Sequence, residues 1–226
     1  MPNDGAPPAE GSEPLRDEPA GDVRVRSTEL VAPGRVWDVR RERFAFGDGE
    51  LTRDYVDHPG AVAALALDEA GRVLLIRQYR HAIAHRDWEI PAGLMDAPGE
   101  SGADAARREL AEETDLEAER WDLLLDVWTS PGGSSEAVRV FLARDLRSAR
   151  APFEREGEEA ELLLRWEPLD SAAEAVLAGR VRNAIAAAAV LAAVAARARG
   201  WSTLRPADAP WTARDLARGQ RSSPSP

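Results

Sequence analysis

Three glutamates stand close together in one part of the sequence, and their spacing favours a shared chemical role. Glu112 and Glu113 follow Glu109 by three and four residues. An α-helix turns by about 100° per residue, so these spacings put all three carboxylates on one face. Such close carboxylates repel one another unless a positive charge lies among them, and a hard divalent cation such as Mg²⁺ or Mn²⁺ takes oxygen ligands. The alternative is a solvated acidic face balanced by Arg107 and Arg108.

The flanking residues predict a helix that carries these glutamates. Ser101, with Asp104 three residues later, is typical of a helix N-cap. Pro98 and Gly99 indicate a loop before it. Asp115 lies where the helix should end, and aspartate tolerates the left-handed backbone conformation better than most residues do.

Length and composition narrow the classes of protein. The chain has 226 residues, enough for one full domain with appendages. A net charge of −11 argues against a general nucleic-acid binder, and the lack of cysteine excludes disulfides and thiolate metal sites. The longest apolar run, residues 184–196, is short for a membrane span, which needs about 20 residues. The N-terminus has no signal-peptide pattern, so we predict a cytoplasmic protein without membrane or nucleic-acid partners.

The two ends of the chain differ from its centre. Residues 1–22 are acidic and rich in proline, and we expect them to be disordered. Residues 23–57 alternate in short pieces around Gly47-Asp48-Gly49, which predicts a small antiparallel sheet. Such a sheet is too small to be stable alone and must pack on the main domain or on another subunit. Residues 201–226 form a tail whose end should be disordered, although two tryptophans suggest that part of it docks.

Residues 58–200 form the main domain, in which strands and helices alternate irregularly. The order of strands, a helix, more strands and then helices predicts an α+β fold, or an α/β/α sandwich. The expected strands are 61–67, 72–79, 88–93, 121–128, 137–143 and 162–168, and the expected later helices are 171–178 and 182–199.

The segment from Gly93 to Leu116 resembles the Nudix box, G-x5-E-x7-R-E-U-x-E-E-x-G-U, in which U is aliphatic. The matching residues are Glu100, Arg108, Glu109, Leu110, Glu112, Glu113 and Leu116. The segment departs from the box in two places. Six residues rather than five separate Gly93 from Glu100, and Asp115 replaces the last glycine. Neither departure removes a metal-binding carboxylate.

Further segments resemble the ADP-ribose pyrophosphatase branch of the Nudix hydrolases, over about residues 36–199. These segments are Arg53-Asp54, 76–81, 88–93 and 130–133. The resemblance implies a Nudix α/β/α sandwich with an additional N-terminal antiparallel sheet, residues 23–57, that is exchanged between the subunits of a homodimer. It also implies hydrolysis of ADP-ribose to AMP and ribose 5-phosphate with Mg²⁺ or Mn²⁺.

The resemblance also implies roles for single residues. The implied metal ligands are the Ala92 carbonyl and the carboxylates of Glu109, Glu112 and Glu113. Arg108 is expected to orient carboxylates through bidentate bonds, and Glu100 to pair with it. The implied substrate contacts are Arg80 at phosphate, Arg53 and Asp54 at the adenine end from the partner subunit, and Gly132 and Glu136 near the terminal ribose.

The catalytic base is the least determined of these residues. Hydrolysis of a pyrophosphate needs neutralised phosphoryl oxygens, a positioned water and a base. Residues 153–161 carry five glutamates, and in this branch a mobile loop at this place supplies the catalytic glutamate. Glu158 is the first candidate and Glu156 the second, and Glu112 is the candidate if the loop does not supply the base.

Two other functions stay open at this point. The enzyme could hydrolyse a different nucleoside diphosphate derivative, such as a nucleotide sugar or NADH, because the metal box contacts only the pyrophosphate. The chain could instead be a non-catalytic Nudix protein that senses ADP-ribose. Such proteins tend to lose acids of the box, whereas all of them are present here.

Overall fold

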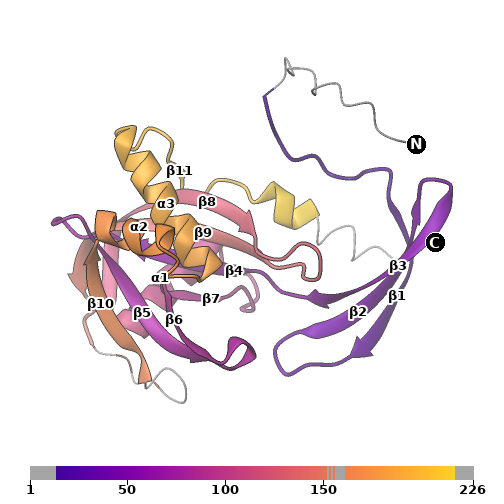
Figure 1. The fold of residues 1–226 in the computed structure, drawn as a ribbon, viewed down its shortest axis with the longest axis horizontal. Coiled ribbons are helices and arrows are strands. Elements are labelled where there is room, and N and C mark those ends of the chain that lie inside the picture. Colours follow the sequence, from indigo (N-terminus) through magenta and orange to yellow (C-terminus); the bar gives the residue numbers. More distant parts are fainter. Residues whose placement is uncertain (1–13, 152, 154, 156–160, 217–226) are drawn as a thin grey trace.

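The computed structural model describes residues 14–151, 153, 155 and 161–216. Figure 1 shows the arrangement of the elements. In chain order they are β1 (Arg24–Ala32), β2 (Asp38–Phe46), β3 (Gly49–Asp57), β4 (Ala61–Ala66), β5 (Arg72–Arg80), the 3-10 turn η1 (His81–Ile83), β6 (His85–Glu89), β7 (Ala92–Leu94), α1 (Gly102–Thr114), β8 (Leu116–Trp128), β9 (Ala137–Ser148), β10 (Leu163–Pro168), α2 (Leu169–Leu177), α3 (Ala184–Ala198) and β11 (Arg205–Pro206).

A mixed sheet in the order β11-β8-β9-β4-β7 forms the middle layer of the main domain. Strand β4 runs parallel to β9. Its successive side chains point to opposite faces of the sheet and all of them are buried, so both faces of the sheet are covered here. Its Leu65 packs in the cluster that contains residues of α2 and α3, while Ala64 packs in the cluster that contains Leu110 of α1. Helices therefore cover both faces, which confirms the predicted α/β/α sandwich and the α+β class.

A second sheet, β10-β5-β6, lies beside the first, and the chain passes between the two sheets at Ile90 and Pro91. The single predicted strand 88–93 is therefore wrong. It is divided into the end of β6, which pairs with β5, and β7, which pairs with β4. Proline lacks the N–H that a continuous ladder would require, which explains why the strand breaks there.

Strands β8 and β9 are longer than the apolar runs that predicted them. They pair with each other from Leu116 to Trp128, well beyond the buried part. Ion pairs support the exposed end of this hairpin, including Arg147 with Glu117 and Arg144 with Asp122. Charged cross-strand pairs extend a ladder without apolar residues, and for that reason the hydrophobic pattern underestimates its length.

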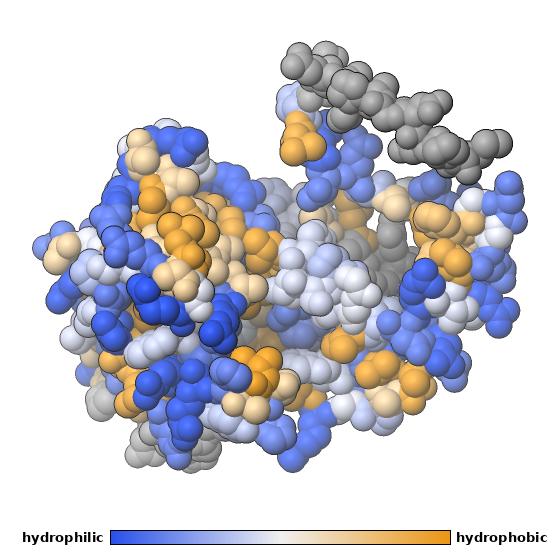
Figure 2. All heavy atoms as spheres, viewed as in Figure 1, coloured by the Kyte–Doolittle hydropathy of each residue, from blue (hydrophilic) through white to orange (hydrophobic). Residues whose placement is uncertain are grey.

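The N-terminal sheet, β1-β2-β3, lies to the right of the main domain in Figure 1 and joins it through the end of β3. The turn at Gly47 and Asp48 connects β2 and β3, as predicted. One face of this sheet carries most of its large apolar side chains together with charged ones, and Leu30 and Phe46 on it are 50% and 59% exposed. Figure 2 shows apolar side chains among charged ones over this sheet.

A segment near the C-terminal end of the described chain, residues 205–214, crosses the main sheet and is called here the C-terminal strap. Its strand β11 pairs with β8. The buried guanidinium of Arg139 donates to the carbonyls of Ala209 and Pro210, and it lies 4.8 Å from the ring centroid of Trp211. The predicted docking of the tail is therefore confirmed for these residues.

Helix α3 contains the longest apolar run of the sequence and packs in the core through Ala186, Ala189 and Val190. Among the helices that the structure describes, none combines the length and the apolar character needed to cross a lipid bilayer.

Candidate active site

Helix α1 has the ends that the sequence predicts. The Ser101 hydroxyl accepts a hydrogen bond from the Asp104 N–H at 3.1 Å, which caps the first turn. Asp115 follows the last helical residue with φ of 56°, in the left-handed region, and its N–H donates to the Ala111 carbonyl. The caps fix where the helix starts and ends, and hence which way the glutamates between them face.

The acids of α1 lie along the side of the helix that faces β7. Leu110 is fully buried on the core side of the helix. Glu113 is only 5% exposed, and its Oε2 accepts a hydrogen bond from the Ala92 N–H at 3.0 Å. The helix and β7 therefore meet through a carboxylate, and Ala92 and Glu113, two of the predicted metal ligands, are in direct contact.

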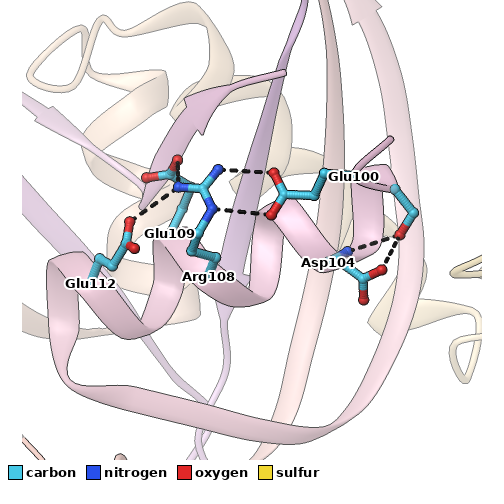
Figure 3. A network of polar contacts seen from close by, with 6 residues as sticks. Glu100, Asp104, Arg108, Glu109 and Glu112 are labelled. Atoms are coloured by element: carbon cyan, nitrogen blue, oxygen red, sulfur yellow. Dashed lines mark hydrogen bonds and ion pairs between the residues drawn. The ribbon is translucent and has the colours of Figure 1, made fainter. Parts of the chain in front are cut away.

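Arg108 lies at the centre of a cluster of carboxylates (Figure 3). Its Nε and Nη2 donate to the two oxygens of Glu100 at 3.1 and 3.0 Å, which confirms the predicted pairing. Its Nη1 donates to Glu109 Oε1 at 2.6 Å and to Glu112 Oε2 at 3.1 Å. These acids, Glu100 first, raise the pKa of Arg108 above its usual value, so the guanidinium stays charged.

The donor set of this site suits a hard divalent cation. Glu109, Glu112 and Glu113 offer only oxygen atoms, and two of them already converge on one positively charged nitrogen. In the structure these two carboxylates are turned toward Arg108, and within the described part of the chain no three acidic or histidine side chains are placed so that they could hold a metal ion. The residue types therefore fit the ion that the Nudix box implies, and the positive charge of Arg108 offsets part of the negative charge of these carboxylates.

Gly93 allows β7 to approach α1 closely. A Cβ atom at this position would lie 1.9 Å from Cδ and 2.0 Å from Oε1 of Glu109. Only a residue without a side chain leaves room for the Glu109 carboxylate, which is the physical reason for the first glycine of the motif.

Arg80 lies at the end of β5 and faces a partner that the sequence analysis did not assign. Its Nε and Nη2 donate to the two oxygens of Glu89 at 2.8 and 2.7 Å, and Gln78 also donates to this carboxylate. Glu89 is 5% exposed, so a buried charge fixes the orientation of the arginine. Glu89 is the one charged residue of the predicted strand 88–93, and this is the signal that could have pointed to it.

Arg53 and Asp54 lie on the N-terminal sheet and point to opposite faces of it, because neighbouring strand residues alternate. The Asp54 carboxylate accepts two hydrogen bonds from Arg41 on β2, at 2.7 and 2.8 Å. These bonds lower the pKa of Asp54. Arg53 instead lies on the same face as Leu30 and Phe46. The two residues therefore do not form a single contact surface within one chain.

Gly132 and Glu136 belong to the loop between β8 and β9, next to the end of β3. Val56 at that end exchanges backbone hydrogen bonds with Gly133 and Ser135 of the loop. Glu136 accepts a hydrogen bond from Thr129, and its Oε1 lies 3.4 Å from Nε2 of buried His58. Gly132 is exposed at the tip of the loop. The structure thus brings these two residues to the junction of the N-terminal sheet with the main domain.

Glu156 and Glu158, the candidate bases, lie outside the described residues, as does the predicted mobility of their segment. Arg155 and Phe153 beside them are described and contact the end of α1. Asp115 accepts a hydrogen bond from the Phe153 N–H at 2.8 Å, which lowers the pKa of Asp115, and its other oxygen pairs with Arg155. The sequence analysis treated Asp115 only as a helix end and gave Arg155 no role.

Comparison with known proteins tests the resemblance directly. A sequence model of the NUDIX domain matches residues 57–188, more than half of the chain. The chain belongs to the Nudix family. Nudix hydrolases generally depend on a divalent metal ion, in agreement with the oxygen-only donor set on α1.

Several proteins similar to this chain are enzymes named for their activities. The chain is 43% identical to the ADP-ribose pyrophosphatase of Mycobacterium tuberculosis over 197 residues, which is 87% of this chain and 94% of that protein. It is 31% identical to the GDP-mannose pyrophosphatase of Cronobacter sakazakii over 61% of this chain and 76% of that protein. A crystal structure of an ADP compounds hydrolase matches with a TM-score of 0.66 and 22% identity, covering 84% of this chain and 99% of that one, and shows the same fold.

Replacing Gly93 with alanine should displace the Glu109 carboxylate, since the new methyl group would occupy its place. We expect Mn²⁺ affinity of this Nudix protein to fall about tenfold or more, the size typical of disturbed metal-site geometry. Isothermal titration calorimetry measures this change. Gly49→Ala is the control, because its nearest neighbouring atom is a carbonyl oxygen at 4.0 Å. Unchanged affinity in Gly93→Ala would show that Glu109 need not keep this position.

Proposed function

We propose that this chain hydrolyses the pyrophosphate bond of ADP-ribose to AMP and ribose 5-phosphate with Mg²⁺ or Mn²⁺. The observation that carries the proposal is the complete set of box acids, which α1 and β7 hold on one side of the helix around Arg108. The similarity to an ADP-ribose pyrophosphatase over 94% of that protein supports the choice of substrate.

Glu109, Glu112, Glu113 and the Ala92 carbonyl would hold the ion, which neutralises charge on the phosphoryl oxygens and makes a bound water more acidic. Arg108 keeps two of these carboxylates together and remains charged, so it limits their mutual repulsion. Arg80 is held by Glu89 and its side chain is about half exposed, an arrangement suited to contact with a phosphate oxygen of the substrate. Glu158, Glu156 or Glu112 as the base stays a prediction.

A second candidate substrate is another nucleoside diphosphate derivative, such as a nucleotide sugar. The similarity to a GDP-mannose pyrophosphatase favours this possibility, although it covers less of the chain. The residues around Arg108 act on the pyrophosphate that all these substrates share, so they do not discriminate. A sensor without activity is disfavoured because no acid of the box is missing.

A hydrolysis panel tests the proposed substrate. We expect ADP-ribose to give the highest kcat/KM among ADP-ribose, GDP-mannose, ADP-glucose and NADH, with Mg²⁺ or Mn²⁺ present. Chromatographic detection of AMP and ribose 5-phosphate identifies the bond that is cleaved. If the chain preferred a nucleotide sugar, that compound would replace ADP-ribose as the proposed substrate. If it hydrolysed none of the four compounds, the proposed enzymatic function would be wrong.

Glu113→Gln should abolish most of the activity, because it removes the charge of a proposed ligand and little volume. We expect kcat to fall by about 10²-fold or more, and excess EDTA to inactivate the wild-type chain. Circular dichroism should show an intact fold, since a glutamine Oε1 can still accept from the Ala92 N–H. Glu117→Gln on β8, a surface acid paired with Arg147, is the control and should keep its activity. Full activity of the wild type in EDTA would contradict the metal assignment.

We also propose that the chain is a homodimer that exchanges its N-terminal sheet. The support is the exposure of Leu30 and Phe46 on one face of that sheet, because these apolar side chains gain stability if a second copy covers them. Arg53 lies on this same face and would reach the partner's substrate.

The double variant Leu30→Asp/Phe46→Asp should be monomeric, because the dimer would have to bury two new charges. Sedimentation equilibrium measures the mass, which for the wild-type dimer is expected at about twice the chain mass of 24.5 kDa. Thr52 lies on the opposite face of β3, so the Thr52→Asp variant is the control and should stay dimeric. A wild-type monomer with full activity at the same concentration would contradict the dimer.

A further inference from the structure

Asp115 replaces a glycine of the Nudix box at a position where glycine would fit the backbone better. Its φ of 56° lies in the left-handed region, which glycine adopts without the steric cost that other residues incur. An aspartate at such a position is therefore worth explaining by what its side chain does.

The side chain and backbone of Asp115 bind the segment that follows β9. Its carbonyl accepts from the Ala149 N–H at 2.9 Å, and its Oδ1 accepts from the Phe153 N–H at 2.8 Å. Its Oδ2 forms an ion pair with Arg155, and both side chains are partly buried. A glycine could keep only the first of these three contacts.

Arg155 continues the connection into the last turn of α1. Its Nε donates to the carbonyl oxygen of Glu112 at 2.9 Å. The last carbonyls of a helix have no partner within the helix, so an external donor fixes the orientation of the turn. This turn carries Glu112 and Glu113, two of the three acids assigned to the metal.

We propose that Asp115 and Arg155 are positioning residues, which anchor the chain beyond β9 to the last turn of α1 and thereby hold Glu112 and Glu113 for metal binding. This inference rests on the proposed function for its activity readout, but the metal-binding readout is independent of the substrate. The anchor acts through the backbone of Glu112 and touches neither substrate nor metal.

Asp115→Gly is the decisive variant. It restores the glycine of the motif and removes the steric cost of the left-handed backbone, and it deletes the carboxylate that contacts Phe153 and Arg155. We expect its Mn²⁺ dissociation constant to rise about tenfold and its kcat for ADP-ribose to fall about 10- to 100-fold, with KM within about twofold. The melting temperature should stay close to that of the wild type. A residue with a purely structural role would change the melting temperature and leave the Mn²⁺ dissociation constant unchanged.

Asp145→Gly is a matched control. Asp145 also has a positive φ, of 55°, but it is exposed, and its side chain has no partner among the residues that the structure describes. The substitution changes the same residue type in the same backbone conformation without touching α1. We expect wild-type Mn²⁺ binding and kcat from this variant.

A double-mutant cycle tests whether the two residues act as one unit. Asp115→Gly and Arg155→Met should each weaken Mn²⁺ binding, and the double variant should be no weaker than the worse single variant. Fully additive losses would overturn the anchor, as would a Mn²⁺ dissociation constant within twofold of wild type in Asp115→Gly. If the wild type binds Mn²⁺ but does not hydrolyse ADP-ribose, the proposed substrate fails, and the Mn²⁺ measurements still decide the anchor.

Discussion

The positive charge of Arg108 is the interaction on which the acidic side of α1 depends. Two unit charges about 4 Å apart interact by about 4 kcal/mol at an effective dielectric constant near 20. Carboxylates as close as those of Glu109 and Glu112 would therefore destabilise the helix if no cation lay between them. One planar guanidinium serves three acids here, because its five N–H groups point in fixed directions. A lysine could neutralise the charge but could not hold this geometry.

The sandwich around α1 must in turn be thin enough for the helix to reach β7. Strand β4 presents mostly alanine to both helical layers, and α1 packs on it through Ala103, Ala105 and Ala106. Small side chains shorten the distance between layers, and Gly93 removes the last obstacle in front of Glu109. The composition of the core and the chemistry of the site are therefore linked through the spacing of the layers, and not only through the box residues.

The sequence predicts most accurately those features that depend on neighbouring residues. The ends of α1 follow from Ser101 and Asp115, because a cap is determined by a few consecutive residues. Likewise the acid-rich face follows from helical spacing alone, with Arg107 and Arg108 as its candidate cations, and the family resemblance selects Arg108 as the one that orients the carboxylates.

Contacts between distant segments were not predictable in the same way. Glu89 meets Arg80 only because β5 and β6 pair in one register, and Arg155 meets the Glu112 carbonyl across 43 positions of the chain. No local pattern encodes these distances. The break at Pro91 was visible in the sequence, but the change of sheet that it permits depends on which strands lie nearby.

The C-terminal strap has a consequence for the order in which this fold can be completed. A chain emerges from the ribosome starting at its N-terminus, and domains begin to fold during synthesis. Arg139 is translated long before Ala209 and Pro210, whose carbonyls its buried guanidinium needs. Until those residues appear, Asp126 on β8 can already pair with the Arg139 guanidinium, but its contacts with the two carbonyls are missing and the edge of β8 is uncovered. The native packing along β8 and around Arg139 is therefore completed only after the strands themselves have been synthesised.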